Sequence, residues 1–158
     1  MSEAFWHLNL LKGWKCFLFL FIAVVTISGG EQFIKLDIEP YKNCFRVVSV
    51  IHELMHALGF YHMHKRTDRD NYLKIYWENV LPDLAHKLEK RTDDELLTDF
   101  GIGYDPESIM HYSRLAFTKN GNITIETIDG LLNDKLGQRE ELSDGDVLRI
   151  RKMFKCDE

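Results

Sequence analysis

The chain has 158 residues, of which 45% are hydrophobic and 28% are charged, and its formal net charge is −5. That apolar content is too high for a disordered chain, and the length suits one domain of ordinary size. The charges are of both signs and interspersed, so we expect no basic surface for nucleic acid and no nucleic-acid partner.

The N-terminal segment differs in composition from the rest of the chain. Residues 16–27, CFLFLFIAVVTI, form an apolar run that follows two lysines and precedes the small residues 28–30. The run is shorter than the roughly 17–25 residues that a membrane-spanning helix needs, so we expect no stable membrane span. The pattern is typical of a signal peptide over residues 1–28, which predicts a secreted, extracellular protein. An uncleaved anchor and a buried strand are the alternatives.

The cysteine pattern depends on that segment. Cys16 would leave with a signal peptide, and Cys44 and Cys156 would then remain in an oxidising compartment. The sequence leaves open whether these two thiols reach each other.

The first half of the chain predicts a strand followed by a helix. Apolar residues alternate over residues 34–38, as in a half-buried strand. From 45 to 58 the apolar positions mostly recur at helical spacing, and Gly59 stands where such a helix would end. Residues 72–77, YLKIYW, form a candidate short strand. Pro82 is well placed to open a helix that extends to about residue 90.

The second half contains several local signals. Thr92 and Glu95 have the spacing of a capping box. Asn120-Gly121, between two apolar runs, predicts a β-hairpin. Residues 122–124, NIT, match the acceptor pattern for N-glycosylation, which has meaning only in a secreted chain.

The chain ends in a predicted helix. Ser143 and Asp146 have the spacing of a cap, and Val147, Ile150 and Phe154 fall on one face of the helix that follows.

A metal site is the strongest functional signal. Residues 52–62 read HELMHALGFYH. His52 and His56 are four residues apart, so on a helix they lie on one face, one turn apart, where both imidazoles can bind one zinc ion. Glu53 is offset around the helix, and its expected role is that of a general base toward a water on the ion.

A catalytic zinc needs a third protein ligand and an open fourth position. His62 supplies that ligand if the chain leaves the helix and doubles back, and Gly59 permits such a turn because glycine adopts positive φ at little cost. Each fixed position of H-E-x-x-H-x-x-G-x-x-H therefore has a physical role, and the motif predicts one zinc per chain. His64, His86 and His111 are expected to be surface or packing residues, because three ligands are already present.

A second segment supports the zinc site. Residues 108–112 read SIMHY, and Met110 follows His62 by 48 residues. In proteases with the long zinc motif, a methionine-bearing turn accompanies the metal. We therefore expect Met110 to form an apolar floor under the imidazoles.

With these motifs the chain resembles the astacin family of zinc metalloproteases, members of the metzincins, from about Gly29 to Cys156. The matching segments are HELMHALGFYH, RTDRDNY, SIMHY and LGQREELSDGDV. The resemblance implies an α+β, zincin-like catalytic domain over residues 29–158, with a zinc helix and a C-terminal lobe that ends in a helix.

The resemblance also implies roles for single residues. His52, His56 and His62 match the zinc ligands, and Glu53 matches the catalytic glutamate. Tyr112 matches a tyrosine that binds the metal and swings to stabilise the tetrahedral intermediate, with packing of its ring as the alternative.

Two departures from the family pattern stand out. Met63 occupies the position after the third histidine, where the family has a glutamate that binds the mature N-terminus. The strands and long helix of the family's N-terminal lobe are not recognisable before residue 29, so the domain is expected to be N-terminally incomplete, with a truncated sheet. In the family, the disulfide partners of Cys44 and Cys156 belong to that lobe.

The sequence therefore predicts a zinc-dependent metalloendopeptidase that acts on protein or peptide substrates. The alternative is an inactive zinc-binding remnant of the family. A purely structural zinc site is disfavoured, because no fourth cysteine or histidine closes the site.

Overall fold

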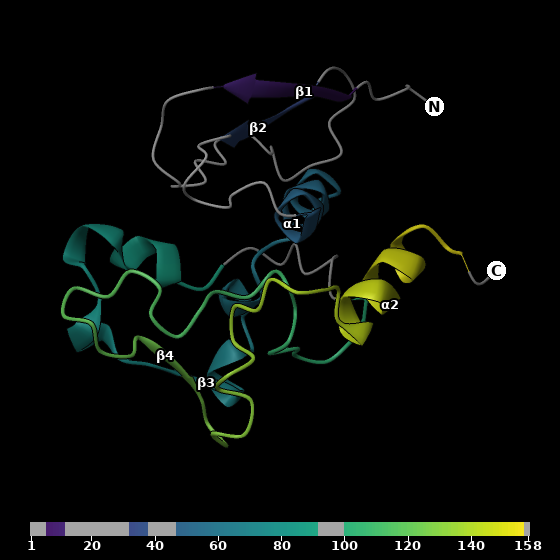
Figure 1. Ribbon diagram of the computed structural model, residues 1–158. Helices are drawn as coiled ribbons and strands as arrows, with labels where there is room; N and C mark the ends of the chain where they lie inside the picture. Colours follow the sequence, from purple (N-terminus) through teal and green to yellow (C-terminus); the bar gives the residue numbers. More distant parts are fainter. Residues whose placement is uncertain (1–5, 12–31, 38–46, 92–99, 157–158) are drawn as a thin grey trace. The chain divides into compact units, whose positions relative to one another are not determined.

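The computed structural model describes residues 6–11, 32–37, 47–91 and 100–156, with side chains from residue 47 onward (Figure 1). The chain divides into two compact units, Met1–Tyr61 and His62–Glu158. Each unit is described by itself below.

The described part of the first unit consists of two strands and one helix. Strand β1 (Trp6–Leu11) runs parallel to β2 (Gln32–Asp37), with Trp6 opposite Gln32 and Leu11 opposite Asp37. The position of β2 agrees with the strand predicted from residue 34 onward. Strand β1 was not predicted, and it lies in the segment that the sequence assigns to a signal peptide. The apolar run 16–27 and Cys44 lie outside the described residues, so the signal peptide stays a prediction.

Helix α1 (Val47–Ala57) confirms the predicted zinc helix. Its C-terminus is closed by two main-chain hydrogen bonds, from Gly59 N–H to the His56 carbonyl at 2.9 Å and from Phe60 N–H to the Met55 carbonyl at 3.0 Å. This pair is the Schellman arrangement, which needs a residue with positive φ just after the helix. Gly59 has φ +99° and provides it, so the predicted turn out of the helix is present.

The second unit is built from short elements around a small apolar core. Strands β3 (Leu73–Ile75) and β4 (Ile125–Thr127) pair antiparallel. Among the described residues, four 3-10 helices precede β4, namely η1 (Met63–Lys65), η2 (Arg69–Asn71), η3 (Trp77–Asn79) and η4 (Pro82–Leu88). The buried residues Leu73, Val80, Leu88, Ile125 and Leu136 form the core cluster.

Two of these elements were expected from the sequence. The strand predicted at 72–77 is present as β3, and the helix opened by Pro82 is present as η4, with 3-10 rather than α geometry. The cap expected at Thr92 and Glu95 lies outside the described residues.

The β-hairpin predicted at Asn120-Gly121 is wrong. The chain does turn there, with Gly121 at φ +82°, and Thr124 N–H donates to the Arg114 carbonyl across the turn at 2.8 Å, but no pair of antiparallel strands flanks it in the described structure. Thr118 forms an isolated bridge with Val80, and β4 pairs with β3. The reason is Asn79, whose carbonyl accepts from Lys119 N–H and whose side-chain amide donates to the Ile123 carbonyl. These bonds take up main-chain groups on both sides of the turn.

Helix α2 (Asp144–Met153) confirms the predicted C-terminal helix and its cap. Ser143 accepts from Asp146 N–H, and Asp146 accepts from Ser143 N–H, which completes a capping box. The apolar face is not what packs, because Val147 and Phe154 are exposed while Asp146 and Arg149 are buried. The described contacts of α2 therefore include the buried polar groups of Asp146 and Arg149.

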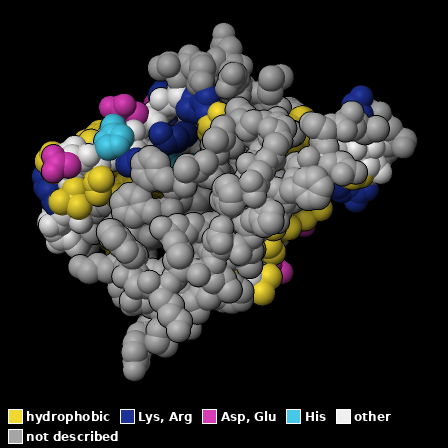
Figure 2. Space-filling model, turned by 90° about the horizontal axis from the view of Figure 1, so that it is seen from above, with side chains coloured by type: hydrophobic (Ala, Val, Ile, Leu, Met, Phe, Trp, Pro, Cys, Tyr) yellow, Lys and Arg dark blue, Asp and Glu magenta, His cyan; other side chains and the backbone are white. Residues whose placement is uncertain are grey.

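The surface carries charges of both signs. On the face shown in Figure 2, the described basic, acidic and apolar side chains lie next to one another. No helix in the described part of the chain is both long and apolar enough to cross a membrane. Cys156 is exposed, and its thiol is free in the described structure.

Candidate metal centre

The first two histidines project from α1, as their spacing predicts. The ring centroids of His52 and His56 are 4.8 Å apart, and the ring planes are nearly perpendicular at 89°. Both residues are buried, with 5% and 7% of their surface exposed. Helix α1 therefore presents two imidazoles from adjacent turns in a sheltered position.

His62 follows the turn at Gly59 in extended conformation, with φ −59° and ψ 135°. The next residue, Met63, donates its N–H to the carbonyl of Met110 at 3.0 Å. The side chains of Met63 and Met110 are both buried. The methionine turn thus holds the main chain beside the third histidine, whereas its expected role as a floor under the metal stays a prediction.

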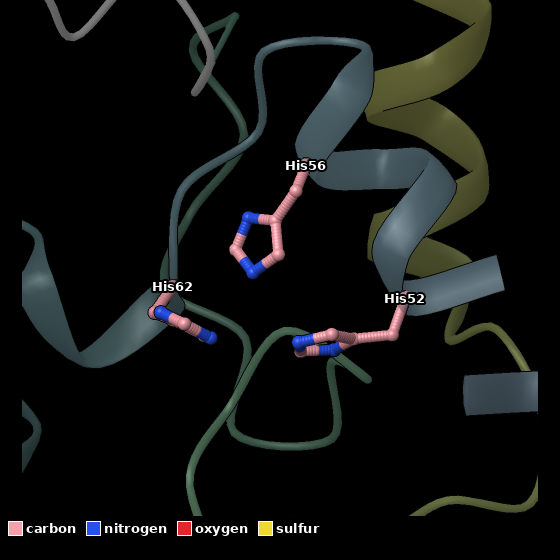
Figure 3. Close-up of side chains that lie close together, drawn as sticks. All are labelled: His52, His56 and His62. Carbon is pink, nitrogen blue, oxygen red and sulfur yellow. The ribbon is translucent and has the colours of Figure 1, made fainter. Parts of the chain in front are cut away.

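The three histidines come together at one point. One ring nitrogen from each of His52, His56 and His62 lies within 4.8 Å of the other two, and the rings converge in Figure 3. A tetrahedral zinc with the usual zinc–nitrogen bonds holds its ligand nitrogens roughly 3.4 Å apart. Three imidazoles that each offer a nitrogen to one point are a donor set that zinc takes in proteins, so the residues present fit the metal.

The hydrogen bond of His56 supports this fit. Its Nδ1 lies 2.8 Å from the Phe60 carbonyl oxygen. A carbonyl can only accept, so Nδ1 carries the proton and Nε2 is the nitrogen with the lone pair. Zinc-binding histidines usually donate their second ring nitrogen in this way, which sets the tautomer needed for a ligand.

Glu53 directly follows His52 on α1, and none of its surface is exposed. A buried carboxylate that follows a metal-binding histidine on the same helix suits a general base toward a water on the metal. Its role as the base stays a prediction.

Tyr112 lies against the third histidine. Its ring centroid is 4.5 Å from that of His62 and 4.0 Å from that of His64, on which it stacks with 27° between the planes. The ring also contacts Phe117 edge to face. The structure thus places the predicted tyrosine beside a candidate ligand, with one side of its ring in the core.

The remaining described histidines are packing or surface residues, as expected. His64 and His111 are completely buried, and burial is the main cause that lowers both pKa values, to about 4 for His111. Both rings are therefore neutral near pH 7. His86 is exposed on η4.

Asp146, predicted as part of the helix cap, also ties the methionine turn to α2, which the sequence did not indicate. The buried Asp146 carboxylate accepts from Ser108 Oγ at 2.6 Å and from Ile109 N–H at 3.0 Å, in addition to its capping bond. The capping-box spacing revealed one partner of this carboxylate. The other two lie 37 and 38 residues away in sequence, where no local pattern points to them.

A protein-family model matches most of the chain. The sequence profile of the peptidase family described as "Astacin" matches residues 15–155. The chain belongs to the astacin family. The matched range begins inside the segment predicted as a signal peptide, ahead of the boundary at residue 29.

Zinc metalloproteinases and a choriolytic enzyme are among the relatives of this chain. It is 38% identical to zinc metalloproteinase nas-6 of Caenorhabditis elegans over 151 residues, which is 95% of this chain and 41% of the relative. It is 47% identical to the low choriolytic enzyme of Oryzias latipes over 115 residues, or 72% of this chain and 40% of the relative. The chain thus spans less than half the length of these relatives.

A solved structure shows the same fold. High choriolytic enzyme 1, a hatching enzyme zinc-protease from Oryzias latipes, superposes with a TM-score of 0.70 at 36% identity. The match covers 82% of this chain and 61% of that one. The predicted α+β astacin fold is confirmed. The family and the histidine set together identify zinc as the metal of this centre.

Proposed function

We propose that this astacin is a zinc-dependent metalloendopeptidase that hydrolyses peptide bonds in protein substrates. The observation that carries the proposal is the convergence of His52, His56 and His62 next to the buried Glu53, in a chain of this family.

Each residue has a chemical role in that reaction. The three imidazoles hold the metal, with the His56 tautomer set by the Phe60 carbonyl. When bound, zinc supplies a Lewis acid that polarises the scissile carbonyl and lowers the pKa of water. The Glu53 carboxylate accepts the proton of the attacking water and passes it to the leaving amine. The Tyr112 hydroxyl donates a hydrogen bond to the oxyanion as charge develops there.

We also propose that the protein is secreted. The signal-like pattern of residues 1–28 supports this location, and the exposed Asn122 offers a readout for it. Asn122 begins the NIT acceptor pattern in a surface turn. Expression with the native N-terminus should give protein in the medium whose glycan is absent from Asn122→Gln. Protein retained inside the cell without glycan would contradict secretion.

The second candidate is a zinc-binding protein without activity. The observation that favours it is Met63, which is buried at the position where the resemblance implies a glutamate. An apolar thioether cannot form the ion pair expected there. In this case the histidines would bind zinc while no peptide bond is cleaved.

A digestion assay separates the two candidates. The 158-residue chain is incubated with casein before and after a chelator, and then with zinc restored. We expect cleavage that the chelator abolishes and that zinc recovers, with a loss of at least about 100-fold in Glu53→Gln, since the base is removed. The exposed Glu78→Gln is the matched control and should keep full activity.

Two results would contradict the enzyme. The mechanism fails if Glu53→Gln keeps normal activity. A folded, zinc-loaded chain that cleaves nothing would identify the inactive zinc-binding protein instead.

A further inference from the structure

We propose that Tyr104 and His111 are positioning residues for Tyr112, and that they hold its main chain so that its phenol ring stays against His62 and His64. The catalytic consequence rests on the function proposed above for Tyr112. The structural part of the proposal stands independently of it. All five residues belong to the second unit.

Two hydrogen bonds connect the three residues. Nδ1 of His111 lies 2.7 Å from the Tyr112 carbonyl oxygen, and Nε2 lies 2.8 Å from the Tyr104 hydroxyl. The carbonyl can only accept, so Nδ1 carries the proton and donates it. In a neutral ring Nε2 then accepts, and the Tyr104 hydroxyl must donate to it. The relay therefore has one direction, from the Tyr104 hydroxyl through the imidazole to the Tyr112 main chain.

The protonation states support that direction. Burial lowers the pKa of His111 to about 4 and raises the pKa of Tyr104 well above its usual value. Near neutral pH the imidazole is therefore neutral and the phenol keeps its proton. These are the two states that the relay requires.

Both ends of the relay are held in place. The Tyr104 ring stacks on Tyr72 with centroids 4.8 Å apart and 12° between the planes, and the Arg66 guanidinium lies 6.0 Å from its centre. The main-chain carbonyl of His111 accepts from both terminal nitrogens of Arg139 at 3.3 Å. The main chain at residues 111 and 112 is thus held by two groups, the His111 imidazole at the Tyr112 carbonyl and the Arg139 guanidinium at the His111 carbonyl.

Ser113, which directly follows Tyr112, is packed closely against Gly137. Gly137, at φ +77°, approaches Ser113 so closely that an added Cβ would lie 2.5 Å from its main-chain nitrogen and 2.7 Å from its Cβ. The residue after Tyr112 therefore has no room to shift toward Gly137. Without the hydrogen bond from His111, the Tyr112 main chain can move only in directions away from Gly137, and its ring then loses its fixed position against the histidines.

Removing the Tyr104 hydroxyl tests the relay with the smallest change. Tyr104→Phe keeps the stacked ring but leaves Nε2 of His111 buried without a donor, and the imidazole then turns to find another partner. We expect kcat for peptide hydrolysis to fall about tenfold with KM unchanged, as for partners that orient catalytic groups. Tyr72→Phe removes a hydroxyl from the other ring of the stack, on a residue that is 41% exposed, and should leave kcat unchanged.

A double mutant separates positioning from general damage. If Tyr104 acts through Tyr112, Tyr104→Phe should lower kcat less than about twofold when Tyr112→Phe is already present. An equal loss of kcat in both backgrounds would overturn the proposal, as would an unchanged kcat in Tyr104→Phe alone.

The structural part has its own readout, which needs no activity. Nitrogen NMR of the zinc-loaded wild-type chain should show His111 protonated on Nδ1 and not on Nε2, and the opposite tautomer would overturn the relay. Proton contacts between the Tyr112 and His64 rings should weaken in Tyr104→Phe and persist in Tyr72→Phe. Persistence in both variants would refute positioning. An inert wild type with the expected NMR result would refute the proposed function alone.

Discussion

At the scale of single residues, His111 shows how burial sets a charge state. Its ring is completely enclosed, and burial lowers its pKa from 6.5 to about 4. In the unfolded chain the same imidazole takes up a proton near pH 6.5. The unfolded state therefore binds more protons than the folded state between these two pH values.

This difference predicts a pH-dependent stability. Because the folded pKa is lowered, the contribution of His111 is complete above about pH 6.5 and is lost as the pH falls toward 4, and it amounts to about 3 kcal/mol. Urea unfolding of chelator-treated protein between pH 4 and 7 measures it, since removal of zinc excludes the pH dependence of metal binding. In His111→Gln the slope over this range should be shallower. An identical slope in the variant would show that other groups cause the effect.

The site residues differ in whether a local sequence pattern determines their positions. His52, His56 and His62 were predicted because the helical period and one glycine turn place them, and both are readable over eleven residues. The hydrogen bond between Tyr104 and His111 was not predicted, although the two residues are seven apart. No regular element spans them, so nothing periodic in the sequence states which way their side chains point.

At the scale of elements, the turn after α1 determines where the third histidine lies. Gly59 has φ +99°, a conformation that costs a residue with a Cβ about 1–2 kcal/mol. Gly59→Ala should therefore weaken zinc binding, because the chain after the helix takes a different course and His62 is displaced. Competition with a chromophoric zinc chelator measures the affinity.

Gly121→Ala is the matched control for this prediction. Gly121 also has positive φ, at +82°, and an added Cβ there meets no atom within 4 Å. Its backbone cost is similar, but it lies in a surface turn of the second unit and should leave zinc affinity unchanged. Equal affinity losses in the two variants would indicate general destabilisation instead.

Helix α2 stabilises the methionine turn through one carboxylate. Asp146→Asn replaces two acceptor oxygens by one, so at least one of the Ser108 hydroxyl, Ile109 N–H and Ser143 N–H loses its partner. We expect the free energy of unfolding in urea to fall by about 2–3 kcal/mol. Asp144→Asn removes the same charge from the exposed first turn of α2 and should cost less than about 1 kcal/mol. Similar losses would rule out the buried contacts as the cause.

Elements with their own caps were predictable, and elements defined by distant partners were not. Helices α1 and α2 carry periodic apolar residues and terminal signals in their own sequence. The hairpin at Asn120-Gly121 failed because the hydrogen bonds of Asn79, some forty residues earlier, determine the pairing. The apolar face of α2 was likewise misleading, since α2 buries Asp146 and Arg149 while Val147 and Phe154 stay exposed.

At the scale of the whole molecule, zinc should contribute to stability as well as to chemistry. A ligand that binds the folded state alone stabilises it by about 2.7 kcal/mol at 100 times its Kd. The melting temperature of the chain should rise on addition of zinc, and most of this rise should vanish in His62→Ala. His86→Ala, at an exposed histidine, is the control and should show the same rise in melting temperature as the wild type. An undiminished rise in His62→Ala would exclude this residue as a ligand.

The hydrogen bond from His56 to the Phe60 carbonyl has a consequence for how the site tolerates mutation. Its acceptor is a main-chain atom, so no exchange of the side chain at position 60 deletes it. The tautomer of His56 with its lone pair on Nε2 therefore depends on the course of the main chain. Substitutions at position 60 that keep this course leave the tautomer unchanged. Substitutions that change the course of the main chain, such as those at Gly59, are the ones that disrupt this hydrogen bond.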